Sequence, residues 1–278
     1  MTSLSAQISE GGLRGPSTVR NALASATAAQ WRNRALMMAR RDAHTTAFDD
    51  YVRALTLDPA DVQALDGFVR SAVLTRRAGD ALSWLATLTA DRPPIPLVLI
   101  ARSKLLSANG AAAEAMEVAR QASLLEPTSP EAIDQIASLQ ADAGDVVQLE
   151  ATVDRLREIS PRRAVTHYYA AVAAFLRDRT EEAVTSSQAA IGLDPSFAPA
   201  YDLLGAALTK LGQDAAARQA FETSLRFDAH DSTAYTNLGL LELAGGNRAA
   251  AQNYFAEALW LAPDSSTARQ GLQRASQR

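Results

Sequence analysis

Three histidines and several carboxylate pairs are the side chains of this sequence that could carry out acid–base or metal chemistry. His44, His167 and His230 could hold a zinc ion or transfer protons, because a neutral imidazole binds metals and titrates near neutral pH. They are spread along the chain, without a His-x-x-x-His pair or a carboxylate partner at ligand spacing. His167 falls at a packing position of a helix, where an interior histidine is expected. We therefore predict no metal site and no cofactor.

Other groups with catalytic potential also lack the partners that catalysis needs. The chain has no cysteine, which excludes a thiol nucleophile, a disulfide and a thiolate metal site. A serine nucleophile would require a base, an orienting group and an oxyanion donor placed together, and no such set is visible. The remaining candidates are interpreted as exposed helix residues or turn glycines: Asp49-Asp50, Glu181-Glu182, Ser186-Ser187, Gly11-Gly12 and Gly245-Gly246. The sequence thus predicts a protein that is not an enzyme.

The elements that would position any binding residues follow a 34-residue period. Six prolines lie on this register, with Ala229 at the one missing place: Pro59, Pro93, Pro127, Pro161, Pro195 and Pro263. Proline cannot continue a helix, so each would end one helix and turn the chain into the next unit. Twelve residues before each place comes a second column: Ala47, Ala81, Ala115, Leu149, Ala183, Ala217 and Ala251. Small side chains there would let two helices cross closely.

Turn residues divide each unit into two helices. Breaks are predicted at Asn109-Gly110, Gly144-Asp145, Gly212-Gln213 and Gly245-Gly246-Asn247. In residues 62–95 the pair Gly79-Asp80 comes three places later than the other turns. Strand patterns are weak, and the longest apolar stretch, residues 95–101, is too short to span a bilayer. Each unit is therefore expected to be helix, tight turn, helix.

The spacing and residue types resemble the tetratricopeptide repeat family. The resemblance is carried by Tyr201, Leu204, Gly205, Leu208, Ala217 and Phe221, and by the corresponding residues of 232–265. It implies an all-α, right-handed superhelical solenoid of about seven helix-turn-helix repeats. The expected repeats are 28–61, 62–95, 96–129, 130–163, 164–197, 198–231 and 232–265. Residues 1–27 would be a flexible, basic segment, and residues 266–278 a capping helix.

The resemblance also implies which residues face the concave groove of such a solenoid. The predicted partner-binding residues are Arg32, Asn33, Arg70, Lys104, Asp134, Tyr168, Tyr169, Phe175, Asn237 and Leu240, with Asp142, Asp202 and Lys210 at further groove positions. On this assignment the N-terminal half of the groove is basic and the C-terminal half is aromatic and apolar. An extended peptide or helix with an acidic end and an apolar end would fit it. Tyr168, Phe175 and Leu240 could equally fill the seam between neighbouring helices.

The predicted function is a non-catalytic scaffold that binds a partner protein or peptide. The alternative is a regulatory or targeting portion of a multidomain enzyme system of transferase or sulfatase-like type. RNA binding is a third possibility, but the net charge of −4 and the lack of a basic residue at a fixed repeat position argue against nucleic acid. No oligomeric state is predicted.

Composition also suggests a source and a compartment. Of the 27 basic residues, 25 are arginine, which indicates a GC-rich bacterial genome. The first residues, MTSLSAQISEGG, lack a basic start followed by an apolar block, so we expect no secretory signal and no membrane insertion. A cytoplasmic location is expected, with the periplasm left open because a chain without cysteine suits both.

Overall fold

The computed structural model describes residues 27–277, and every regular element in that range is an α-helix. The predicted all-α helical repeat solenoid is therefore confirmed. The basic segment expected at residues 1–27 lies outside the described residues except for Thr27. The side chain of Thr27 accepts a hydrogen bond from the backbone of Gln30 and caps the first described helix.

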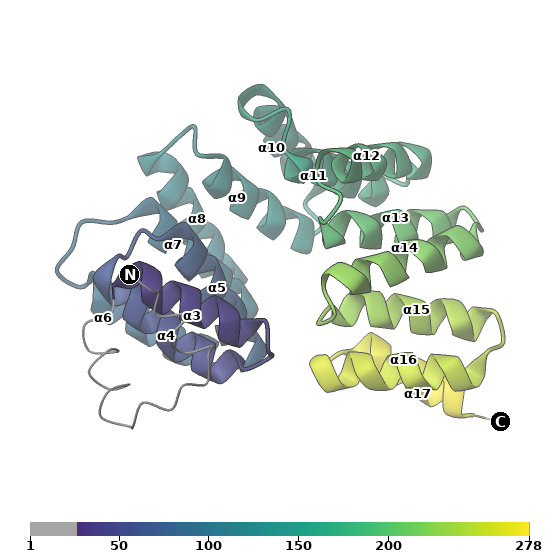
Figure 1. The fold of residues 1–278 in the computed structure, drawn as a ribbon. Helices are drawn as coiled ribbons and strands as arrows, with labels where there is room; N and C mark the ends of the chain where they lie inside the picture. Colours follow the sequence, from purple (N-terminus) through teal and green to yellow (C-terminus); the bar gives the residue numbers. More distant parts are fainter. Residues whose placement is uncertain (1–26, 278) are drawn as a thin grey trace, which may run out of the picture. The chain divides into compact units, whose positions relative to one another are not determined.

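The helices alternate between a first and a second helix of each pair, and one further first helix follows the last pair (Figure 1). The first helices are α3 (Ala28–Ala39), α5 (Val62–Leu74), α7 (Pro96–Ala108), α9 (Pro130–Asp142), α11 (Ala164–Leu176), α13 (Ala198–Lys210), α15 (Ser232–Ala244) and α17 (Ser266–Ser276). The second helices are α4 (His44–Leu57), α6 (Ala78–Thr89), α8 (Ala112–Leu125), α10 (Val146–Ile159), α12 (Thr180–Leu193), α14 (Asp214–Phe227) and α16 (Arg248–Leu261). Successive first helices thus begin 34 residues apart along the whole described chain.

The turn inside each helix pair has the same construction in all seven pairs. One residue in the left-handed backbone region closes the first helix: Asp42, Arg76, Gly110, Gly144, Asp178, Gly212 and Gly246. The next residue donates its backbone N–H to the carbonyl five positions earlier, for example Gln213 to Leu208 at 2.9 Å. This is the Schellman arrangement, and it satisfies carbonyls that a helix end leaves unpaired. Gly79 lies in the first turn of α6 instead, and Arg76 makes the turn of that pair.

The second column of the period forms the contact between paired helices. Ala47, Ala81, Ala115, Leu149, Ala183, Ala217 and Ala251 each have 0% of their surface exposed. On the facing first helix, glycine leaves room that an aromatic ring fills. A Cβ on Gly205 would lie 2.6 Å from Cε1 of Phe221, and one on Gly239 would lie 2.7 Å from Cε1 of Phe255. Close approach of backbone to ring therefore sets the helix spacing in these pairs.

The described chain divides into two compact units inside α9, between Leu139 and Gln140. Unit 1, which ends at Leu139, has an aromatic core in which the rings of Phe48 and Phe68 stack at 5.0 Å between centroids. Unit 2, which starts at Gln140, is packed mainly through alanines, with Phe221 and Phe255 as its largest fully buried rings. The expected assignment of residues 28–265 to a single array, followed by a separate cap, stays a prediction.

The last helix, α17, closes unit 2 by the same packing that joins its helix pairs. Gly271 lies directly against the Phe255 ring, because a Cβ added there would come within 2.3 Å of Cζ. Ala268 and Ala275 are buried beside it, and Gln252 on α16 donates to the carbonyl of Ala275 at 3.0 Å. Phe255 therefore packs against two glycines, Gly239 and Gly271, on successive first helices.

Candidate functional site

Two of the predicted groove cations in unit 1 are used in ion pairs within the chain. Arg32 on α3 pairs with Asp61, the residue that caps α5, at 2.7 Å between Nη1 and Oδ2. Lys104 on α7 pairs with Asp66 on α5 at 3.0 Å between Nζ and Oδ1. These pairs join neighbouring first helices and neutralise much of the basic character that the sequence suggested.

The other predicted residues of unit 1 differ in exposure. Asn33 and Arg70 are exposed, on α3 and α5. Arg70 lies close enough to Tyr51 for its charge to act on that phenol. Asp134 on α9 is half-buried. These three residues come from three different first helices, and their role in partner binding stays a prediction.

In unit 2, the first helices bring aromatic side chains together across a repeat boundary. The ring of Tyr168 on α11 lies 5.1 Å from that of Tyr169 and packs edge-on against Phe197, just before α13, at 5.5 Å between centroids. Tyr169 is only 8% exposed and belongs to the helix packing. Tyr168 is half-buried, so part of its surface stays available.

Three carboxylates lie close enough to Tyr168 for their charges to act on its phenol. Burial raises the pKa of Tyr168 to about 12, and the charges of Asp202, Asp142 and Asp231 raise it as well, because a phenolate would be repelled by them. These residues come from α13, from the end of α9 and from the link before α15. We call Asp142, Asp202 and Asp231 the carboxylate cluster. Desolvation also raises the pKa of Asp142 itself.

Asp202 is the most perturbed member of the carboxylate cluster. Burial raises its pKa to about 9, a hydrogen bond with Asp231 and the negative charge of that residue act in the same direction, and Asp228 adds to the effect. A carboxyl group with such a pKa holds its proton at neutral pH and donates it to the neighbouring carboxylate. Asp231 in turn accepts the backbone N–H groups of Thr233 at 2.7 Å and Ala234 at 3.2 Å, which caps α15.

The remaining predicted residues of unit 2 lie along the same first helices. Phe175 on α11 has the ammonium of Lys210 4.9 Å from its ring centroid, and Lys210 is also hydrogen-bonded to Asp178. Asn237 on α15 is half-buried, and Leu240, on the same helix, is 36% exposed. The predicted residues of unit 2 thus belong to α11, α13 and α15.

The assignment based on repeat positions missed two residues of this arrangement, Asp231 and Phe197. Asp231 and Phe197 precede the helices α15 and α13, where the family pattern places no groove residue. For Asp231 a signal was present, because aspartate before an apolar helical run is a frequent N-cap. For Phe197 no pattern in the sequence distinguishes a ring that contacts Tyr168 from one that fills the link.

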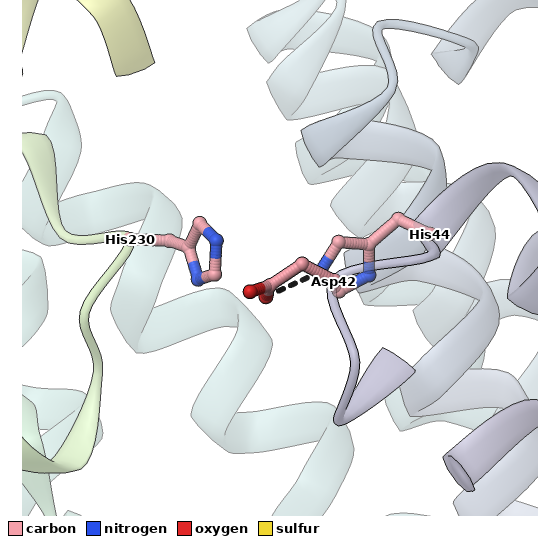
Figure 2. Close-up of side chains that lie close together, drawn as sticks. All are labelled: Asp42, His44 and His230. Carbon is pink, nitrogen blue, oxygen red and sulfur yellow. Dashed lines mark ion pairs between the residues drawn. The ribbon is translucent and has the colours of Figure 1, made fainter. Parts of the chain in front are cut away.

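The histidines are used in local contacts. Figure 2 shows Asp42 and His44, which pair at 3.9 Å between Oδ1 and Nε2 at the start of α4. His230, also drawn there, belongs to unit 2, where its backbone N–H donates to Asp228 at 3.1 Å. His167 contacts the carbonyl oxygen of Pro161 at 3.0 Å through Nε2. Along residues 27–277, no helix has the length and apolar character that crossing a bilayer requires.

Comparisons with known proteins agree with the helical repeat. The tetratricopeptide repeat family model matches residues 198–231 and 232–265. A solved tetratricopeptide repeat protein from Parabacteroides merdae ATCC 43184 superposes with a TM-score of 0.65 at 15% identity, over 90% of this chain and 99% of that one. A thermophilic tetratricopeptide repeat protein of Thermus thermophilus gives a TM-score of 0.58 at 23% identity, over 65% of this chain and 98% of that one. No curated protein matches the chain in sequence.

At these identities the solved structures show a shared fold, while the family model identifies two repeats in the sequence itself. Both agree with the period of the helix starts and with the seven Schellman turns described above. Residues 198–265 thus match the tetratricopeptide repeat family, and the described chain shares the helical-repeat fold of the two solved proteins.

Proposed function

We propose that this chain is a non-catalytic scaffold that binds an extended segment of a partner protein along the first helices of unit 2. Stacked helical repeats present long, continuous surfaces of this kind, and binding to other proteins is their general use. The proposed surface contains Tyr168, Phe175, Asn237 and Leu240, which we call the α11–α15 face.

The observation that carries the proposal is the interaction of half-exposed aromatic side chains with polar groups from successive first helices. The pKa of Tyr168 is raised by burial and by the carboxylates of Asp202 on α13 and Asp231 at the α15 cap. The ammonium of Lys210 on α13 lies over the ring of Phe175. Partly buried aromatic side chains next to polar groups are the usual anchors of protein interfaces. An extended segment that follows these helices would contact each in turn.

Photo-crosslinking tests the assignment. A photoreactive phenylalanine analogue is placed at Leu240 on the α11–α15 face, or at Leu193 at the end of α12 as a matched control. The two leucines are 36% and 44% exposed, and both belong to unit 2. We expect a partner protein to crosslink from position 240 and not from position 193.

Substitution at the same two positions gives the second measurement. Leu240→Asp should reduce retention of that partner about tenfold or more, because one buried apolar anchor contributes about 2 kcal/mol. Leu193→Asp should leave retention unchanged. Equal loss in both variants, or crosslinking from position 193 alone, would place the binding surface elsewhere.

A further inference from the structure

We infer that Asn109, in the turn between α7 and α8, is a site of covalent modification that the folded turn protects. The modification is the loss of ammonia from the side chain, and its isoaspartate product prevents the turn from closing again. Asn109-Gly110 is the one Asn-Gly pair in the sequence. The inference concerns unit 1 and is independent of the partner binding proposed for unit 2.

The chemistry follows from a labile side chain placed before a residue without a Cβ. Asparagine is among the chemically labile residues, and glycine lets the next backbone nitrogen approach the side-chain carbonyl. Hydroxide takes the proton of the Gly110 amide, and the nitrogen bonds to Cγ of Asn109 to form a cyclic imide. The bond from Cγ to Nδ2 breaks, and ammonia leaves with a proton from water, which restores the hydroxide.

Water then opens the imide in one of two directions. Cleavage between Cγ and the nitrogen of Gly110 gives aspartate with the original main chain. Cleavage between the main-chain carbonyl carbon and that nitrogen gives isoaspartate, in which the main chain runs through Cγ of the modified residue. Neither direction needs an oxidant or a reductant, so solvent supplies every co-reactant.

The Asn109-Gly110 pair is open to solvent. Both residues are exposed. Among the described residues, apart from the chain neighbours of Gly110, no atom lies within 4 Å of a Cβ added to that glycine. Asn247, in the turn before α16, differs on both counts, because Arg248 follows it and its Nδ2 donates to Glu242 at 2.8 Å. Hydroxide and water can therefore reach Asn109 in the folded chain.

The folded turn nevertheless keeps the reacting atoms apart. Asn109 has a ψ of 6°, which turns the nitrogen of Gly110 toward the backbone nitrogen of Asn109 and away from its side chain. Ring closure requires rotation about this bond. The N–H of Gly110 donates to the carbonyl of Ser107 at 2.9 Å, and that of Ala111 donates to Leu106 at 2.9 Å. The rotation breaks both bonds, so the reaction requires local opening of the turn.

The isoaspartate product should hold the turn open. Its main chain is one carbon longer, which adds about 1.5 Å between the residues before and after the modified position. Both donors, Gly110 and Ala111, follow this position, and both acceptors, Leu106 and Ser107, precede it. Such a displacement takes a hydrogen bond out of its range of geometry. Aspartate leaves the main chain unchanged, so only isoaspartate should have this effect.

The first test compares rates in the folded and unfolded chain. The full chain in native buffer, the full chain in urea, and a synthetic peptide of residues 103–115 are incubated at neutral and at mildly alkaline pH. Mass spectrometry with electron-transfer fragmentation measures asparagine, aspartate and isoaspartate at position 109. We expect Asn109 to be lost at least about tenfold more slowly from the folded chain than from the other two samples. The rate should rise with pH in all three samples.

Internal controls are present in the same digest. Asn33, Asn237 and Asn253 lie inside helices and precede larger residues, and Asn247 is bound to Glu242, so all four should stay intact. Asn109→Gln, which would have to form a larger ring, should also stay intact. Equal rates in the folded chain and the peptide would overturn the protection by the turn. A peptide or a folded chain that never loses ammonia at Asn109 would overturn the modification site itself.

The second test separates the longer main chain from the added charge. Peptides with isoaspartate and with aspartate at position 109 separate by chromatography, so hydrogen exchange can be followed for each form within one aged sample. The amides of Gly110 and Ala111 should exchange at least about tenfold faster in the isoaspartate form than in the unmodified chain. Asn109→Asp, which adds the charge alone, should exchange like the unmodified chain. Equal exchange in the isoaspartate form and in Asn109→Asp would contradict the inferred opening of the turn.

Discussion

Replacing Gly239 by alanine should destabilise unit 2, although alanine is the better helix former. Gly239 lies inside α15, where the change to alanine gains about 1 kcal/mol in helix propensity. The added Cβ would lie 2.7 and 2.8 Å from two atoms of the Phe255 ring, which is 0% exposed. The ring has little room to shift, because it also packs against α17 at Gly271. Overpacking of this kind costs about 1 to 3 kcal/mol, so we expect a net loss of about 1 kcal/mol.

The matched control is Gly192→Ala near the end of α12, where no atom lies within 4 Å of the added methyl. This variant should gain up to about 1 kcal/mol, so the two identical substitutions should differ in sign. Urea unfolding followed by circular dichroism measures both. A third variant, Gly239→Ala with Phe255→Leu, tests the contact directly, because the coupling between the two changes should be about 1 kcal/mol. If Gly239→Ala and Gly192→Ala are equally stable, the ring does not set the spacing of α15 and α16, and our account of the packing is wrong.

Three further predictions follow from the turns, a buried ion pair and the carboxylate cluster. Gly246→Ala should lower the free energy of unfolding by about 1 kcal/mol, because the φ of Gly246 is +82°. Arg76→Gly should raise it, because glycine relieves the same strain at φ +56°. Thermal or urea unfolding measures both variants. Glu242 is 3% exposed and is bound by Arg218 and by Asn247, so Glu242→Ala should cost about 2 kcal/mol in the same assay; no change would show that the pair is not needed. Folded Asp202 keeps its proton up to a pKa of about 9 while the unfolded chain loses it near pH 4, so the unfolding free energy should fall as pH rises between these values. Tm measured from pH 5 to 9 should show this fall, and Asp202→Asn should flatten it.

The period of the sequence predicted most of the fold, because proline and small residues act locally. The turns at Gly110, Gly144, Gly212 and Gly246 were visible as glycines that can adopt the left-handed backbone region. The turns at Asp42, Arg76 and Asp178 were not, since aspartate and arginine are also common inside helices and adopt this region here because the helices on both sides require it. Gly79 illustrates the converse, as a glycine within a helix that makes no turn.

Surface pairing was harder to infer than packing, because it depends on residues far apart in the sequence. The pattern placed Arg32 and Lys104 on a basic surface, but their partners Asp61 and Asp66 lie 29 and 38 residues away. The exposure of Tyr168 next to the burial of Tyr169 depends on the rotation of the helix, which repeat position alone does not give. The predicted groove residues stay a prediction.

The seven turns that share one geometry also set where the folded chain opens first. Neighbouring helix pairs of a stacked array unfold locally and refold. The backbone amides at the least stable connections exchange their hydrogens fastest. Asp42, Arg76 and Asp178 hold left-handed conformations without the freedom of glycine, so the amides around these three turns should exchange ahead of those around the four glycine turns. The positions of glycine along the chain would then mark the places where the array opens last.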